Sequence, residues 1–177
     1  LGGPLPHVMA AKAVAFKEAL KPDFKNYAQQ IVRNSQALAE ACIKEGMKVL
    51  TGGTDNHLLQ IDVFTTFGLT GRQAEDALRE CGLTMNRNSL PFDINGVWYT
   101  SGLRLGTPAL TTLGMKEVEM KQVATMIKNA LVATKPGLGK DGSKSLAKYV
   151  LESEVRDSIK IEAGELLKRF RLYPELD

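Results

Sequence analysis

The sequence contains few of the residues that carry metal, redox or membrane chemistry. It has two cysteines, two histidines and one tryptophan among 177 residues. Cys42 and Cys81 lie far apart, with no CxxC pair and no neighbouring histidine, so we expect reduced, buried thiols of a cytoplasmic protein rather than a metal site or a disulfide. No apolar stretch reaches the roughly 20 residues that a membrane span needs. The net charge of +3 comes without a run of Lys or Arg, so neither membrane nor nucleic acid is an expected partner.

Common catalytic signatures are also missing. The sequence shows no Ser-His-Asp order, no cluster of metal ligands and no G-x-G-x-x-G fingerprint. It starts at Leu1 without an initiator methionine, and no charged segment precedes an apolar one as in a signal peptide. We therefore expect a fragment or a processed chain.

The first 64 residues predict two helices followed by two strands. Residues 4–20 and 23–45 have apolar residues at helical spacing, with prolines at the first start, Asp23 as the expected cap of the second helix and Gly46 as its stop. The apolar runs 47–50 and 57–64 are separated by turn residues, and the second run alternates between apolar and polar residues. These runs predict neighbouring antiparallel strands.

The rest of the chain predicts further helices between short strands. Thr70-Gly71-Arg72-Gln73 has the form of a capping box before a helix over 74–81. Short strands and turns follow to residue 106, and then a helix is predicted over 115–133. Residues 136–145 are rich in Gly and Lys and predict a surface loop, and 145–170 a last helix. The expected fold class is α+β, with antiparallel strands covered by helices on one face.

Arg104 is the most informative single residue. It lies between two leucines in a strand-like apolar run that is flanked by Gly102 and Gly106. An arginine buried in such a run needs an anionic partner, and its planar guanidinium group can donate two parallel hydrogen bonds to a carboxylate. The residues alone leave two interpretations equally open, which are a bound substrate carboxylate and a structural ion pair with an Asp or Glu of this chain.

Weaker candidates lie at helix starts and turns. The glycines before the first helix could present backbone N–H groups to a phosphate, although an ordinary helix start has the same pattern. His57, at a strand start, is more typical of a structural residue than of a catalyst. The turns at 86–89 and 95–99 surround the only tryptophan, Trp98, which could contact a flat ligand or be half-buried in a loop.

Five motifs appear together and in order. They are Gly2-Gly3-Pro4-Leu5-x-His7, Ala10-Ala11-Lys12-Ala13-Val14-Ala15, Gly52-Gly53-Thr54-Asp55-Asn56-His57, Asn86-x-Asn88, and Ser101-Gly102-Leu103-Arg104-Leu105-Gly106-Thr107-Pro108-Ala109. With these motifs the chain resembles the serine hydroxymethyltransferases over residues 1 to about 135, and more loosely beyond. It departs from them at Leu113, where the family often has arginine, and in residues 136–144, which match no family segment that we can assign.

The resemblance implies a type I pyridoxal-phosphate (PLP) enzyme that transfers a one-carbon unit reversibly from serine to tetrahydrofolate, giving glycine. It implies that residues 1–45 are linking helices, that 46–177 form the small C-terminal domain, and that the enzyme is a homodimer. Arg104 matches the arginine that binds the substrate carboxylate. Gly3 matches a glycine that touches the cofactor phosphate, which is bound mainly by the other subunit. The matches to folate-contacting positions are Asn88, Gly96, Val97 and Trp98, whereas Asp55 and His57 match a structural signature.

The resemblance also implies that the catalytic lysine is not in this chain. The family's Thr-His-Lys-Thr stretch, whose lysine forms the Schiff base with PLP, is expected upstream of Leu1. No lysine here has that context, so we expect the chain alone to be inactive. The alternative is a non-catalytic folded fragment or interaction module that binds ligands only weakly.

Overall fold

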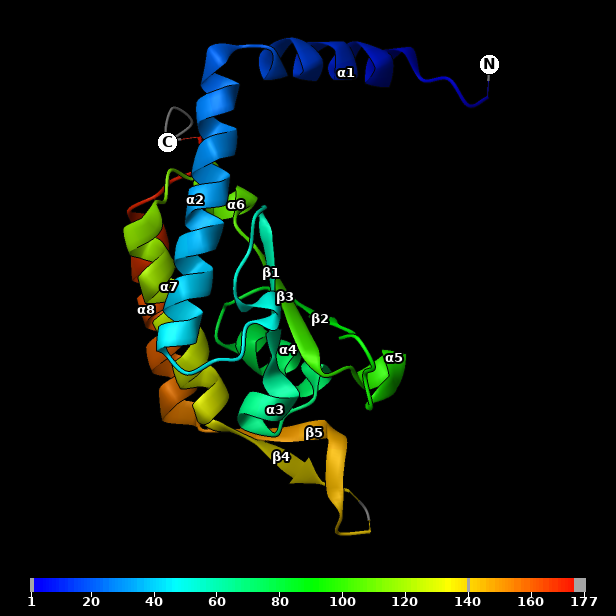
Figure 1. The fold of residues 1–177 in the computed structure, drawn as a ribbon, viewed down its shortest axis with the longest axis vertical. Helices are drawn as coiled ribbons and strands as arrows, with labels where there is room; N and C mark the ends of the chain where they lie inside the picture. Colours follow the sequence, from blue (N-terminus) through cyan, green and yellow to red (C-terminus); the bar gives the residue numbers. More distant parts are fainter. Residues whose placement is uncertain (1, 140, 174–177) are drawn as a thin grey trace.

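The computed structural model describes residues 2–139 and 141–173 and has the α+β fold expected from the sequence (Figure 1). The strands form two antiparallel sheets, and helices precede, separate and follow the strands along the chain. In chain order the elements are α1 (Pro6–Ala19), α2 (Pro22–Lys44), a 3-10 turn η1 (Leu50–Gly52), β1 (Leu58–Asp62), α3 (Val63–Phe67), α4 (Gly71–Glu80), β2 (Asn86–Asn88), α5 (Gly96–Tyr99), β3 (Gly102–Gly106), α6 (Pro108–Thr112), α7 (Glu117–Val132), β4 (Thr134–Leu138), β5 (Lys144–Leu151) and α8 (Ser153–Lys168).

The first two helices lie where the sequence predicts them but differ in their packing. Helix α1 has no buried residue and projects away from α2 and the rest of the molecule (Figure 1). Helix α2 begins at Pro22, and its N-cap is Lys21 rather than Asp23, because the proline occupies the first helical turn and leaves Asp23 inside it. Gly46, with φ of 81°, follows the end of α2 as expected.

The first sheet has the strand order β1-β3-β2, and both pairings are antiparallel. The expected neighbour of β1 is reduced to a single bridge between Val49 and Ile61. Strand β1 stops at Asp62, earlier than the predicted run to residue 64. The Asp62 carboxylate accepts a hydrogen bond from the backbone N–H of Thr65 at 2.9 Å and so caps the short helix α3.

One face of this sheet is apolar and forms part of the core. Leu59 and Ile61 of β1 and Leu103 and Leu105 of β3 are buried on that face, as the alternation in the sequence predicts. The core extends from these residues to α2, α4, α7 and α8. Its most deeply buried helix residues include Leu38, Cys42, Leu78, Met120, Ile127 and Ile159.

The C-terminal third differs most from the sequence prediction. The predicted loop over 136–145 and the start of the predicted last helix instead form the hairpin β4–β5, and α8 begins only at Ser153. Along β5, Leu146, Lys148 and Val150 are exposed and their neighbours are half-buried, which is the period of a strand. The two apolar residues 146 and 150 are four apart, a spacing that also fits a helix, and this explains the wrong prediction.

Both cysteines are buried and unpaired, as the sequence predicts. Burial first, and Glu45 second, raise the pKa of the Cys42 thiol to about 12. In the part of the chain that the structure describes, no helix is long and apolar enough to cross a bilayer, and no group of three acidic, His or Cys side chains could hold a metal.

Candidate functional site

The second face of the three-stranded sheet is polar. The register places Gln60 of β1, Arg104 of β3 and Asn86 of β2 in one row, because Gln60 and Asn86 are both paired with Arg104. Asn88 lies two residues along β2 and shares this face. Arg104 and Asn88, which the sequence analysis selected separately, are therefore brought to one surface.

Arg104 is exposed, whereas Leu103 and Leu105 on either side are buried. Arg104 therefore does not need the anionic partner that burial between the leucines would have required, since alternate residues of a strand point to opposite faces. Its Nε donates a hydrogen bond to Oδ1 of Asn86 at 3.3 Å. Within residues 2–139 and 141–173, Arg104 forms no ion pair with an Asp or Glu, so its two terminal nitrogens can bind another group.

A cavity of about 980 Å³ opens beside Arg104. It is lined by α2, by the turn over 51–56 and by β1. Of the described residues that line it, only Arg104 carries a positive charge. Glu40 and Asp55 also line the cavity, so Arg104 is the group in it that can bind an anion directly, and the two carboxylates disfavour anions elsewhere in the cavity.

Glycine at 102 is required by close packing beside the arginine. A Cβ on Gly102 would lie 2.5 Å from Cδ2 of Leu90 and 2.9 Å from the carbonyl oxygen of Asn88. Any larger residue would push β2 away from β3. The glycine therefore keeps Asn88 at a fixed position relative to Arg104.

The turn over 54–57 is built by two of its polar side chains. Oγ1 of Thr54 donates to the carbonyl oxygen of Leu58, and Oδ1 of Asn56 accepts from the backbone N–H of Leu58 at 2.8 Å. The side chains of Asp55 and His57 are exposed. The contacts that form the start of β1 thus come from Thr54 and Asn56.

Gly96, Val97 and Trp98 form most of α5, on the loop between β2 and β3. Asp93 closes this loop by accepting four hydrogen bonds, from the backbone N–H groups of Leu90, Asn95 and Ser101 and from Oγ of Ser101. Burial alone would raise the pKa of Asp93, but these hydrogen bonds lower it below its ordinary value.

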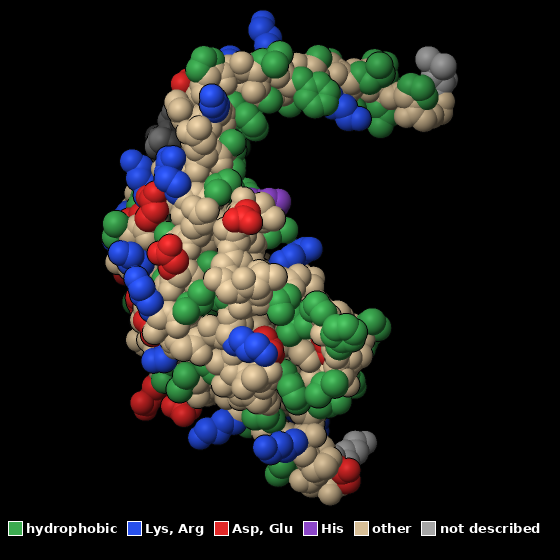
Figure 2. Space-filling view, in the orientation of Figure 1, with side chains coloured by type: hydrophobic (Ala, Val, Ile, Leu, Met, Phe, Trp, Pro, Cys, Tyr) green, Lys and Arg blue, Asp and Glu red, His purple; other side chains and the backbone are tan. Residues whose placement is uncertain are grey.

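The loop carries a group of exposed apolar side chains, visible over α5 in Figure 2. The residues are Phe92, Ile94, Val97 and Trp98. Trp98 lies beside two arginines, since the guanidinium carbons of Arg72 and Arg87 are each 5.9 Å from the centre of its ring. Arg87 belongs to the edge strand β2 and points to the face opposite Asn88, so the ring beside it lies at this edge of the sheet and not on the polar face.

Gly3 is remote from these residues. It is exposed, precedes α1, and is placed at the far end of that projecting helix (Figure 1). No described atom outside its chain neighbours comes within 4 Å of a Cβ built on it. The structure therefore brings Arg104 and Asn88 together, places residues 96–98 at the adjoining edge, and leaves Gly3 apart.

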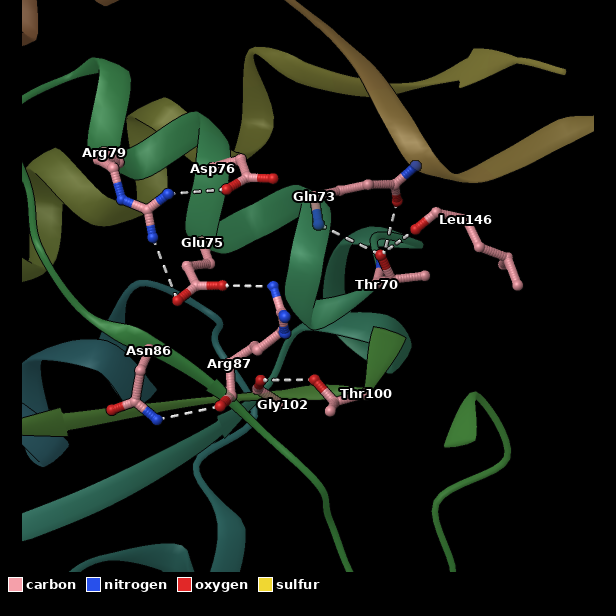
Figure 3. Close-up of polar contacts among 10 residues, drawn as sticks. All are labelled: Thr70, Gln73, Glu75, Asp76, Arg79, Asn86, Arg87, Thr100, Gly102 and Leu146. Atoms are coloured by element: carbon pink, nitrogen blue, oxygen red, sulfur yellow. Dashed lines mark hydrogen bonds and ion pairs between the residues drawn. The ribbon is translucent and has the colours of Figure 1, made fainter. Parts of the chain in front are cut away.

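Three contributors were missed as site residues by the sequence analysis. Asn86 orients Arg104, Asp93 closes the loop, and Glu75 binds Arg87 at 2.9 Å (Figure 3). The alternation of Asn86-x-Asn88 could have indicated the first, since it places both amides on one face. Asp93 was assigned only to a turn, and nothing in the sequence pairs Glu75 with Arg87.

The comparisons with known proteins agree with the motifs on which this site rests. A sequence model of the family described as "Serine hydroxymethyltransferase" matches residues 1–127. Curated proteins of that name are 60% identical in Treponema pallidum, 55% in Salinispora tropica and 51% in Chlamydia muridarum, each over the whole chain. These alignments include residues 136–144, which the motif comparison could not place.

The chain spans about a third of the length of these relatives, covering 31%, 37% and 35% of them. The match includes the strand that carries Arg104, the turn over 51–57 and the loop closed by Asp93. The family model and the alignments over the whole of this chain thus agree, and the chain belongs to the serine hydroxymethyltransferase family.

Proposed function

We propose that this chain supplies the substrate-carboxylate site and one wall of the folate site of a complete serine hydroxymethyltransferase. The reaction is the reversible transfer of a one-carbon unit from serine to tetrahydrofolate, giving glycine. The observation that carries the proposal is Arg104, an exposed arginine on the polar face of the sheet, whose terminal nitrogens have no carboxylate partner among the described residues.

The geometry of Arg104 supports a bidentate contact with a carboxylate. Its Nε is used by Asn86, which orients the guanidinium plane and leaves both terminal nitrogens for the two oxygens of one carboxylate. This contact would fix the amino acid at one end, so that the reacting carbon is held in one orientation.

Folate binding is assigned to Asn88, Gly96, Val97 and Trp98. Asn88 shares the polar face with Arg104, and the apolar group over α5 suits the flat ring system of a folate. Because Trp98 lies at the sheet edge, we assign it to the rim of this site and the Asn88 amide to its floor.

PLP, when bound, supplies the electron sink for the chemistry at the amino acid. This chain offers it only a partial site, since the described surroundings of Gly3 contain no side chain that could enclose a phosphate. The free backbone N–H groups before α1 fit a single contact of that kind. We assign the Schiff-base lysine and the rest of the cofactor site to parts of the enzyme outside these 177 residues.

The assembly proposed for the enzyme is a cytoplasmic homodimer. The reduced, buried cysteines are consistent with such a compartment. The apolar side chains exposed on α1, among them Met9, Val14 and Phe16, are consistent with a helix covered by another part of the assembly. The division into linking helices (1–45) and small domain (46–177) stays a prediction, and α2 packs much of its length onto the core.

The proposal is tested with Arg104→Lys in the full-length enzyme. Because a point charge cannot reproduce the planar fork, kcat/KM for serine should fall roughly 30- to 1000-fold, equivalent to about 2–4 kcal/mol of lost transition-state stabilisation. Arg156→Lys is the matched control, since Arg156 lies on α8 and pairs with Asp157. Normal serine affinity and turnover in Arg104→Lys would refute the assignment and favour the non-catalytic module.

A further inference from the structure

The loop that carries α5 is attached to α4 through Trp98. Both arginines beside the ring lie within the roughly 6 Å at which a cation is attracted to an aromatic face. They differ in origin, because Arg72 belongs to the first turn of α4 and Arg87 to β2. The ring thus connects the loop both to a helix and to the edge strand.

Of these two arginines, Arg87 alone forms an ion pair among the described residues. Its Nη1 is 2.9 Å from Oε2 of Glu75, and the other oxygen of Glu75 is 3.3 Å from Nη2 of Arg79 (Figure 3). The Glu75 side chain is 12% exposed and that of Arg87 is 32% exposed. A pair shielded to this extent is screened less than a surface pair and holds its geometry better.

Arg72 is placed less favourably. It lies in the first turn of α4, where the helix dipole disfavours a positive charge. In the part of the chain that the structure describes, it forms no ion pair. The ordered support for the ring therefore comes from Arg87, and the position of Arg87 depends on Glu75.

The start of α4 is itself fixed against the loop. A Cβ on Gly71 would lie 2.1 Å from Oγ1 of Thr100 and 2.6 Å from the carbonyl oxygen of Gly102, so the helix packs directly on the end of the loop. The backbone N–H of Gly71 donates to the carbonyl oxygen of Thr100 at 3.0 Å. The start of α4, and with it the backbone of Glu75 one turn later, is therefore held against the end of the loop.

We propose that Glu75 is a positioning residue for folate binding. Through Arg87 it holds the Trp98 ring, and with it α5, in the orientation in which the loop lines the folate site. Glu75 pairs with both Arg79 and Arg87, and of these two arginines Arg87 is the one that lies over the Trp98 ring. The inference rests on the proposed function, in which residues 96–98 contact tetrahydrofolate.

The test is Glu75→Gln in the full-length enzyme. Losing the charge should release Arg87 and raise KM for tetrahydrofolate roughly three- to tenfold, the scale of one partly shielded ion pair and one cation–aromatic contact. KM for serine and kcat should stay within about twofold, because neither depends on the ring. A general folding defect would not separate these constants.

Trp98 emission gives a second readout that does not require catalysis. The difference between each variant and the same variant with Trp98→Phe isolates the emission of this ring in the full-length enzyme. In Glu75→Gln the isolated emission should shift and become easier to quench with acrylamide, because the ring loses its support. Glu75→Asp, which retains the charge, should recover part of both effects.

Asp76→Asn is the matched control. Asp76 is the next residue on α4 and pairs with Arg79 at 2.9 Å, but it has no contact with Arg87 in the described structure (Figure 3). Equal effects of Asp76→Asn and Glu75→Gln on KM for tetrahydrofolate, or unchanged Trp98 emission in Glu75→Gln, would overturn the proposal.

Two further outcomes, a variant that does not fold and a failure of the proposed function, can be distinguished from a failure of this proposal. If Glu75→Gln does not fold, Arg87→Lys tests the same contact, since it preserves the charge but removes the planar group over the ring; unchanged KM for tetrahydrofolate would then count against the proposal. A wild-type enzyme without hydroxymethyl transfer would overturn the proposed function. A Trp98 emission change in Glu75→Gln would then still support the positioning of the ring by Glu75.

Discussion

Asp93 shows how a single carboxylate can hold a whole loop. Its two oxygens accept four hydrogen bonds from three residues between positions 90 and 101, so both ends of the loop meet at one side chain. The apolar side chains of Phe92, Ile94, Val97 and Trp98 between those ends are exposed. Asp93 therefore fixes the two ends of the candidate folate loop to each other, in addition to the contacts of Trp98 with Arg72 and Arg87.

The lowered pKa of Asp93 gives a pH dependence with a definite sign. A carboxyl group whose pKa is lower in the folded state stabilises the fold above its unfolded pKa of roughly 3.9, and this stabilisation is lost as pH falls through the folded pKa. The Trp98 emission of the wild-type chain should therefore change as pH falls below about 4, before or together with global unfolding.

Asp93→Asn should remove this transition and destabilise the loop already at neutral pH. The amide retains one acceptor oxygen but not the charge, and we expect a loss of about 1–3 kcal/mol. Urea unfolding at pH 7 and emission between pH 5 and 2 provide the measurements. Asp23→Asn, on the exposed start of α2, is the control. A pH profile in Asp93→Asn identical to that of the wild type would contradict the role given to Asp93.

At the residue scale, the sequence was sufficient to select Arg104 as a candidate binding residue but not to predict which residues surround it. Residue type and flanking glycines were sufficient to select it, and the structure places it on a polar face. Its environment could not be predicted, because a run of alternating Leu and Arg does not reveal which face is buried until the strand pairs. Asn86, its hydrogen-bond partner, became apparent only through the register.

At the scale of elements, α4 connects the two sheets. Its capping box is complete, with Oγ1 of Thr70 accepting from the N–H of Gln73 and Oε1 of Gln73 accepting from the N–H of Thr70. The same Gln73 side chain donates from Nε2 to the carbonyl oxygens of Ser145 and Lys148 at 2.7 and 2.6 Å. Oγ1 of Thr70 donates to the carbonyl oxygen of Leu146, a bond drawn in Figure 3. The helix cap therefore also anchors β5.

Substitutions at Gln73 should separate these two roles. Gln73→Leu removes the cap and the tether and should cost about 2–4 kcal/mol of unfolding free energy, since buried backbone groups lose their partners. Gln73→Glu retains the acceptor for Thr70 but loses the donor, so hydrogen exchange should increase mainly in 144–151. Gln122→Leu, at an exposed position on α7, should change stability by less than about 0.5 kcal/mol. Unchanged exchange in β5 of Gln73→Glu would contradict the tether.

This tether also explains why the hairpin was not predicted. The capping box was predicted from four residues because its contacts are local. The β4–β5 hairpin pairs residues 6 to 17 positions apart, but the spacing of Leu146 and Val150 also fits a helix, and the contacts of β5 with Gln73 span more than 70 positions, which no local pattern encodes. Where packing was local or periodic, as in α2, α4 and α7, the sequence predicted the element; where long-range hydrogen bonds decided, it did not.

At the scale of the whole molecule, the core and α1 are energetically separate. Residues of α2, the sheet, α4, α7 and α8 bury one another, whereas α1 buries none of its side chains (Figure 1). Apolar side chains along α1 nevertheless remain exposed. A helix of this composition is better suited to docking on another surface than to remaining in solvent.

Truncations should reveal this separation. Deleting residues 1–20 should shift the thermal midpoint of the remaining chain by no more than about 2 °C, because no buried contact is lost. Deleting residues 152–177 removes Ile159, Ala163 and Leu166 from the core and should abolish cooperative unfolding, since the loss is comparable to a typical total stability of about 5–15 kcal/mol. Circular dichroism melts of the three chains provide the comparison. A fall of more than about 5 °C on removing 1–20 would mean that α1 packs on the core in solution. Its apolar face would then be covered by this chain itself, rather than left free for the rest of the enzyme.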